Sequence, residues 1–119
     1  IDPDHEWILD QFAIGKTESG RSFFHPDPDP PAERIRELAA TDLRFSLAVS
    51  LNATTDETRK RLMRAARDLD DTLEAARDFA RSRHERVTLE YVLIAGENDT
   101  DEDARRLAEI AAGRSFKLN

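Results

Sequence analysis

The sequence holds 119 residues, of which 39% are hydrophobic and 36% charged, a composition typical of one globular domain. Its formal net charge of -7 argues against a nucleic-acid-binding module with one broad basic face, and leaves room only for local basic clusters. Because cysteine is absent, these residues supply no disulfide, no thiolate metal ligand and no cysteine nucleophile.

No stretch approaches the about 20 apolar residues of a membrane span, and the N-terminus lacks the basic and apolar regions of a signal peptide. We therefore expect a soluble, cytoplasmic protein that does not contact a membrane. The chain begins at Ile1 and its one methionine is Met63, so we expect a fragment or a processed product. The histidines are not paired at metal-ligand spacing, and we predict no metal site; they are His5, His25 and His84.

The first 30 residues are interrupted by Gly15, by Gly20 and by alternating proline and aspartate over residues 26–31. Each proline fixes its own φ and pushes the preceding residue out of the helical region, which favours a stiff extended linker. We predict that residues 1–30 form an irregular N-terminal segment with a Pro/Asp linker, and that the domain proper covers residues 31–119.

Regular patterns begin at Pro31, a residue type that favours the first turn of a helix. Ile35 and Leu38 then mark one face of a short amphipathic helix. Residues 43–50 (LRFSLAVS) alternate apolar positions with period two, which predicts a buried strand.

A helical stretch follows from Thr54, which has the spacing of a capping box with Glu57. Its apolar positions recur at alternating steps of four and three residues without proline or glycine. Two interpretations stay open: one helix of about 27 residues, which helix propensity favours, or two helices with a break near residues 68–71. The apolar positions are Leu62, Ala66, Leu69, Leu73, Ala76 and Ala80.

The richest strand pattern covers residues 86–95 (RVTLEYVLIA) and stops at the turn-forming residues 96–99. Thr100 then predicts the start of a helix that ends at Gly113, and residues 115–119 resemble the opening of another strand. Because each strand is followed by a helix, the order predicts an α/β fold with a parallel sheet that forms an incomplete arc of a β/α barrel.

Two motifs, residues 47–59 (LAVSLNATTDETR) and 86–94 (RVTLEYVLI) with Gly96 and Asn98-Asp99 behind them, resemble a known enzyme family. It is the radical S-adenosylmethionine (SAM) family that methylates C2 of an adenosine in 23S ribosomal RNA and, in some members, transfer RNA. The resemblance covers about residues 31–119 and implies a partial barrel of the radical SAM type.

The resemblance also implies cofactors and a site. Members hold SAM and a 4Fe–4S cluster, and their Ser-Leu-His or Ser-Leu-Asn stretch lines the SAM pocket, so it assigns cofactor binding to Ser50, Leu51 and Asn52. Such residues just past the end of a parallel strand are well placed for a ligand. Glu90 matches the family's Glu-Tyr-Val-Leu motif and, inside a barrel, would need a hydrogen-bond partner.

The departures from the family are equally specific. The three-cysteine cluster motif and the two cysteines that handle the methyl group and the RNA adduct have no counterparts in the sequence. The Pro-Ile-Asn turn after Met63 is replaced by residues 64–66, and Ala95 stands where an Asp is common. We therefore expect a fragment or divergent copy of an RNA methyltransferase, without catalytic residues of its own and inactive alone.

An alternative function is a non-catalytic α/β or helical interaction module. The stripe over residues 62–80 would then pair with a partner helix, and the open sheet edge at 114–119 could self-associate. RNA is the partner that the family implies. A basic group toward the end of the long helix would either contact RNA or form a solvated helix end; it comprises Arg77, Arg81, Arg83, His84 and Arg86.

Overall fold

The computed structural model describes residues 7, 12–16, 18–26, 32–64 and 66–119, to which the structural statements below apply. Five strands form one sheet in the order β1-β2-β3-β4-β5. They are β1 (Phe12–Lys16), β2 (Ser22–Pro26), β3 (Ser46–Ser50), β4 (Val87–Glu90) and β5 (Phe116–Leu118). The helices are α2 (Ala32–Ala39), α3 (Asp56–Leu62), α4 (Leu69–Arg83) and α5 (Asp101–Ala111).

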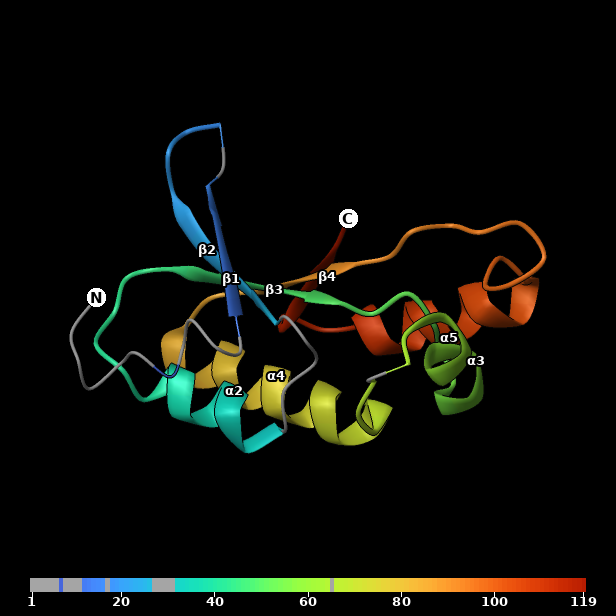
Figure 1. The fold of residues 1–119 in the computed structure, drawn as a ribbon, viewed down its shortest axis with the longest axis horizontal. Coiled ribbons are helices and arrows are strands. Elements are labelled where there is room, and N and C mark those ends of the chain that lie inside the picture. Colours follow the sequence, from blue (N-terminus) through green and yellow to red (C-terminus); the bar gives the residue numbers. More distant parts are fainter. Residues whose placement is uncertain (1–6, 8–11, 17, 27–31, 65) are drawn as a thin grey trace.

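The sheet is parallel from β2 to β5, and β1 pairs antiparallel with β2. It does not close on itself, since β1 and β5 lie at its two edges. The predicted α/β fold with an open parallel arc is therefore confirmed. In Figure 1, β3 and β4 run in the same direction and end on the side of α3 and α5.

The predicted irregular N-terminal segment is wrong for residues 12–16 and 22–26, which form the two antiparallel strands of the β1–β2 hairpin. Gly20 has a φ of 86° in the connection, so the glycine makes a hairpin loop possible where the sequence suggested an interruption. Phe12 and Phe24 are buried, which adds the hairpin to the hydrophobic core. The Pro/Asp run over residues 27–31 and most of residues 6–12 lie outside the described residues.

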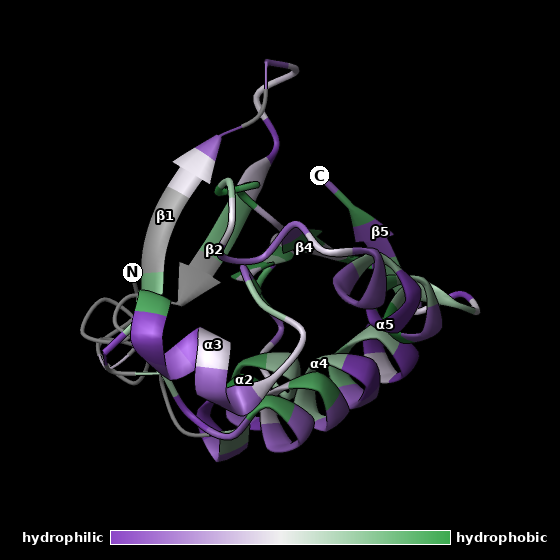
Figure 2. Cartoon of the chain, turned by 90° about the vertical axis from the view of Figure 1, so that its right-hand side faces the viewer, coloured by the Kyte–Doolittle hydropathy of each residue, from purple (hydrophilic) through white to green (hydrophobic). Residues whose placement is uncertain are grey.

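The core lies between one face of the sheet and the pair α2 and α4, which pack against each other (Figure 1). Phe24 stacks on Phe45 with ring centroids 4.4 Å apart, and Phe45 contacts Phe79 of α4 at 5.6 Å. In Figure 2 the hydrophobic residues of α4 gather on the side toward the sheet, and its hydrophilic residues face outward. Aliphatic side chains complete this core, among them Ile35, Leu38, Leu47, Val49, Leu73, Val87 and Leu89.

The favoured single helix over residues 56–82 is wrong, and the two-helix interpretation is correct. Met63 leaves the helical region with a φ of -135°, and α4 begins after Asp68, whose side chain accepts a hydrogen bond from the Asp71 amide. The Asp56 carboxylate also accepts from the Leu69 amide at 2.7 Å, which joins the start of α3 to the start of α4. These contacts outweigh the helix propensity of the intervening residues.

The apolar stripe over residues 62–80 does not form a free face for a partner helix. Leu69, Leu73, Ala76 and Ala80 are all buried within the chain's own core. The repeat of apolar residues therefore reflects packing of α4 on the sheet and on α2, and the expected coiled-coil seam is corrected on this ground. The open edge of β5 stays a predicted site of self-association.

Three element boundaries differ from the sequence predictions. β4 ends at Glu90 rather than residue 95, and β3 begins at Ser46 rather than residue 43. The Arg83 guanidinium donates to the Leu43 carbonyl, and at 2.8 Å to the Thr41 carbonyl, which gives these groups partners outside the sheet. The N-cap of α3 is Thr55, one residue after the predicted Thr54.

The C-terminal quarter follows the sequence closely. Thr100 and Asp103 form the capping box of α5, with each side chain bonded to the other residue's backbone amide. Gly113 follows the helix with a φ of 93°, as a glycine at this position commonly does. None of the helices in the described part of the chain is long and apolar enough to cross a membrane.

Candidate functional site

The sheet face opposite α2 and α4 carries a polar group near the ends of its strands. Side chains alternate along β4, so that Val87 and Leu89 are buried in the core while Thr88 and Glu90 are half-buried toward the other face. A hollow of about 570 Å³ lies over this face. Its polar lining includes Ser46, Thr88, Glu90, Lys117 and Asn119.

The register places two of the predicted residues beside each other. Ser50, the last residue of β3, is the direct partner of Glu90, the last residue of β4. The Tyr91 amide donates to the Asn119 carbonyl at 3.0 Å, which extends the pairing toward β5. A hydroxyl and a carboxylate therefore meet at the carboxyl edge of the parallel strands, where ligands of such sheets bind.

Leu51 plays a structural part in this edge. Its side chain is fully buried in the core. Its amide donates to the Glu90 carbonyl at 2.9 Å, and its carbonyl accepts from the Arg59 Nε at 3.2 Å. Leu51 thus anchors the segment, while Ser50 and Asn52 on either side carry the polar side chains.

Asn52 turns the chain away from the sheet. It adopts a φ of 57°, a left-handed conformation that asparagine tolerates better than most residues. Its Oδ1 accepts from the Val92 amide at 2.9 Å, while among the described residues its Nδ2 contacts only the Met63 sulfur, at 3.8 Å. Because sulfur is a weak acceptor, the Asn52 amide group keeps donor capacity for a ligand.

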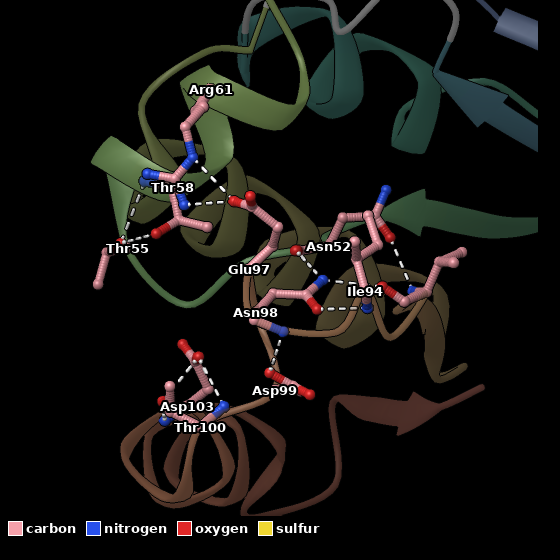
Figure 3. Close-up of polar contacts among 12 residues, drawn as sticks. Asn52, Thr55, Thr58, Arg61, Ile94, Glu97, Asn98, Asp99, Thr100 and Asp103 are labelled. Atoms are coloured by element: carbon pink, nitrogen blue, oxygen red, sulfur yellow. Dashed lines mark hydrogen bonds and ion pairs between the residues drawn. The ribbon is translucent and has the colours of Figure 1, made fainter.

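Asn98 holds the two strand-end segments together. Its side chain is 1% exposed, and its Nδ2 donates to the carbonyls of Asn52 and Val92, both at 2.8 Å. Its Oδ1 accepts from the Ile94 amide at 2.7 Å, so three backbone groups are satisfied by one side chain. Figure 3 shows the Asn98 side chain with its hydrogen bonds to Asn52 and Ile94. This arrangement ends β4 early and fixes the position of Asn52.

Arg59 holds the same segment in place through its guanidinium group. It is completely buried, although its neighbours on α3 are largely exposed. Its guanidinium donates to the carbonyls of Leu51 at 3.2 Å, Ser50 at 3.1 Å and Arg67 at 3.0 Å. One charged group therefore orients the backbone at the end of β3 and also binds the linker between α3 and α4.

The start of α5 is tied to the loop after β3 by a buried polar cluster. The Thr54 hydroxyl donates to Asp103 at 2.6 Å, and Arg106 donates to Thr54 at 2.9 Å and to Asp103 at 3.2 Å. The Thr54 hydrogen bond, together with those from Thr100 and Arg106, lowers the pKa of Asp103 to about 2. The carboxylate thus stays ionised and links α5 to the strand-end segment.

A short apolar loop projects beside this edge. Val92, Leu93 and Ile94 are 63%, 72% and 40% exposed, although Asn98 fixes their backbone. At its far end, Arg61 of α3 makes two hydrogen bonds to the Glu97 carboxylate, at 2.8 and 3.0 Å (Figure 3). The loop is therefore an ordered apolar projection between α3 and α5.

Tyr91 packs at the base of this loop. Its hydroxyl donates to the Asn98 carbonyl at 2.6 Å. Burial first, and then the negative charge of Asp103, raise the pKa of Tyr91 above its ordinary value. The phenol therefore stays protonated and keeps donating this hydrogen bond.

The structure brings Ser50, Asn52 and Glu90 to one edge. The sequence predicted a strand end for Ser50 and Asn52, whereas it placed Glu90 inside a strand that it extended to residue 95. Sequence reasoning missed Arg59 and assigned Asn98 to a simple turn. No sequence pattern marked Arg59, because it is the one buried residue of α3 and the residues that follow it, Lys60 and Arg61, are also basic. In the described part of the chain, no group of acidic or histidine side chains is arranged to hold a metal ion.

The predicted basic group is divided by the structure. Arg83 donates to backbone carbonyls and lies over the Phe45 ring at 4.5 Å, and Arg77 lies over the Phe116 ring at 5.4 Å. Arg81 pairs with Asp78 at 2.8 Å. The two other members of the predicted basic group, His84 and Arg86, are exposed to solvent.

Comparison with known proteins gives consistent matches to one kind of enzyme, although no protein-family model matches the chain. The probable dual-specificity RNA methyltransferase RlmN of Symbiobacterium thermophilum is 45% identical over 87 residues, which are 71% of this chain and 24% of that protein. The dual-specificity RNA methyltransferase RlmN 2 of Myxococcus xanthus is 47% identical over 116 residues, which are 90% of this chain and 30% of that protein.

A solved structure agrees with these sequence matches. The crystal structure of a radical SAM methyltransferase from Sphaerobacter thermophilus superposes with a TM-score of 0.69 and 36% identity, over 74% of this chain and 26% of that one. The chain thus spans about a quarter of the length of the proteins that it matches. The sequence match over 116 residues also extends beyond the range of residues 31–119 that the motifs indicated.

Proposed function

We propose a function from the premise that this chain belongs to the RlmN family of radical SAM RNA methyltransferases, as a segment of about a quarter of their length. In our proposal Ser50, Leu51 and Asn52 form one wall of the SAM site. The observation that carries it is the meeting of Ser50, Asn52 and Glu90 at the carboxyl edge of the sheet, on a segment anchored by Arg59. The parallel strands β2 to β5 and the helices between them form the barrel segment in this proposal, and we propose a cytoplasmic location for it.

The donor and acceptor types at this edge suit SAM. The ligand offers ribose hydroxyls, an adenine ring, a carboxylate and an ammonium group. The Ser50 hydroxyl both donates and accepts, the Asn52 Nδ2 donates, and the Glu90 carboxylate accepts from hydroxyl or ammonium groups. The role of Leu51 is to hold the two flanking residues in place through its bonded backbone. Bound SAM would supply the methyl group and the radical chemistry that the family uses.

A 4Fe–4S cluster does not fit these residues, because the sequence contains no cysteine to ligate its irons. In our proposal the cluster, the two cysteines of methyl transfer and the remaining barrel belong to residues outside these 119. The chain alone is then inactive, and its contribution to methylation of an RNA adenosine is to bind and orient SAM. Our proposal assigns no catalytic residue to this segment.

The apolar loop favours the alternative, a non-catalytic interaction module. Val92 and Leu93 are more than half exposed and held rigidly by Asn98, as a contact surface would be. Such a module would bind a protein partner through this loop and would have no affinity for SAM. The two functions are therefore separated by a single ligand titration.

Calorimetric titration of SAM into the chain tests the proposal. We expect saturable binding that Ser50→Ala weakens and that Asn52→Gly weakens while preserving the backbone conformation at φ 57°. Ser82→Ala is the matched control, because its hydroxyl bonds to the Phe79 carbonyl on α4, on a different element from the strand-end segment. Absence of binding heat, or equal binding by all variants, would refute the SAM site and favour the interaction module.

A further inference from the structure

A row of arginines lies at the edge of the sheet where the parallel strands begin. The proposed SAM site lies at the opposite edge, where these strands end. Each strand of the parallel part is preceded, within two residues, by an arginine: Arg21 before β2, Arg44 before β3, Arg86 before β4 and Arg114 before β5. Because parallel strands all begin at the same edge, the topology brings together four residues that are far apart in the sequence. We call this row the basic edge.

Two neighbouring hollows mark the basic edge. One of about 440 Å³ is lined by Arg21 and Arg44, and one of about 560 Å³ by Arg86 and Arg114 together with His84 at the end of α4. Adjacent strands lie about 4.8 Å apart, so the row extends for about 15 Å. A nucleic-acid strand carries one phosphate per about 3.4 Å of helix axis, so a row of this length faces several phosphates.

Among the described residues, one acidic side chain lines the two hollows of the basic edge. Glu85 lines both hollows, but its carboxylate already accepts from Arg21 and, at 2.6 Å, from the Ser46 hydroxyl. Within the described residues, Arg44, Arg86 and Arg114 make no side-chain hydrogen bond or ion pair. Three exposed guanidinium groups are thus left on a chain with a net charge of -7.

The C-terminal ends of helices neutralise only part of the positive charge of the basic edge. α2, α4 and α5 all end near the edge, since each precedes a parallel strand, and a helix C-terminus carries about half a negative charge that attracts cations. Three such ends balance about one and a half positive charges, which leaves an excess of positive charge.

We propose that the basic edge binds the phosphate backbone of RNA, through Arg44, Arg86 and Arg114 as its exposed contacts. The inference rests on the proposed function, because that function supplies RNA as the partner, and it adds where RNA touches this segment. Guanidinium groups suit this role because they bind phosphate oxygens in pairs.

Fluorescence anisotropy with a labelled RNA hairpin, measured over about 50 to 200 mM salt, tests this proposal. The test variant is Arg86→Gln/Arg114→Gln, and the matched control is Lys60→Gln/Arg105→Gln, which removes the same charge from exposed positions on α3 and α5. We expect the test variant to lose about 10-fold in affinity and about two units of salt slope, and the control to lose less than about 2-fold. Urea unfolding confirms that both variants are folded.

Equal losses in both variants, or no RNA binding by the wild-type chain, would overturn the proposal. Saturable binding of inorganic phosphate without RNA binding would also overturn it, in favour of a small-anion site. SAM titration of the Arg86→Gln/Arg114→Gln variant separates the two proposals, because the SAM site lies at the other edge and its affinity should be unchanged. A wild-type chain that binds RNA here but not SAM would refute the proposed SAM site alone.

Discussion

Replacing Arg59 by methionine tests whether the end of β3 depends on one buried guanidinium. The variant keeps a long side chain in the core but removes the donors to the carbonyls of Ser50, Leu51 and Arg67. A buried acceptor that loses its donor costs about 1–3 kcal/mol. Ser50 is half-buried and Arg67 exposed, so water can solvate part of what is lost and the lower values apply. We therefore expect Arg59→Met to lower the free energy of unfolding by about 3–4 kcal/mol.

This loss is large for a chain of this size. At about 0.05–0.15 kcal/mol per residue, 119 residues give a total stability of about 6–18 kcal/mol. Arg59→Lys should cost less, about 2 kcal/mol, because an ammonium group reaches one carbonyl but not all three. Arg105→Met, an exposed substitution on α5, is the control and should change stability by less than about 0.5 kcal/mol.

Urea unfolding followed by the fluorescence of Trp7 and by circular dichroism measures these differences. If Arg59→Met unfolded within about 1 kcal/mol of the wild type, the backbone at the end of β3 would not depend on Arg59. Equal stability of the lysine and methionine variants would likewise refute the reasoning, since it would mean that the hydrogen bonds contribute nothing beyond the packing of the stem.

Three further predictions concern the polar groups around this edge. Asn52→Ala should cost about 2 kcal/mol and Asn52→Gly about 1, because both lose the bond from the Val92 amide but only alanine is strained at φ 57°; equal urea midpoints would contradict this. Tyr91→Phe should cost about 1 kcal/mol in the same assay through loss of its hydroxyl bond, and no loss would contradict that bond. The folded-state pKa of Asp103 is about 2, below its ordinary 3.8, so its carboxylate stabilises the fold above pH 3.8 and loses this effect as the pH falls toward 2. Urea unfolding at pH 5 and pH 2 should therefore show a gap between wild type and Asp103→Asn that narrows at the lower pH, and a constant gap would refute the lowered pKa.

Local sequence patterns determined the elements that depend on interactions between residues close in the sequence. The alternation of apolar residues predicts the core of β3 and β4, and the Thr100 and Asp103 spacing predicts the start of α5. Gly113 predicts its end. These features depend on neighbours within a few residues, whose geometry is set by backbone sterics and local hydrogen bonds.

The N-terminal hairpin and the break between α3 and α4 required the tertiary structure. Helix propensity treats residues 63–68 as acceptable helix, whereas the Asp56 to Leu69 bond and the Arg59 to Arg67 bond favour a turn. The hairpin likewise gains its stability from Phe24 stacking on Phe45, a residue far along the chain. Neither contact leaves a periodic signal in the sequence.

Some features of the candidate site were likewise predictable from the sequence, and others required the tertiary structure. The sequence by itself identified Ser50, Leu51, Asn52 and Glu90 through their resemblance to family motifs. It placed the first three at a strand end, but Glu90 in the middle of a strand predicted to continue to residue 95. Only the folded chain shows that the Leu51 side chain is buried in the core and that the arginines before successive strands form one edge. The physical reason is that a motif records residue types in order, whereas hydrogen bonds and charge clusters depend on which distant segments the sheet brings side by side.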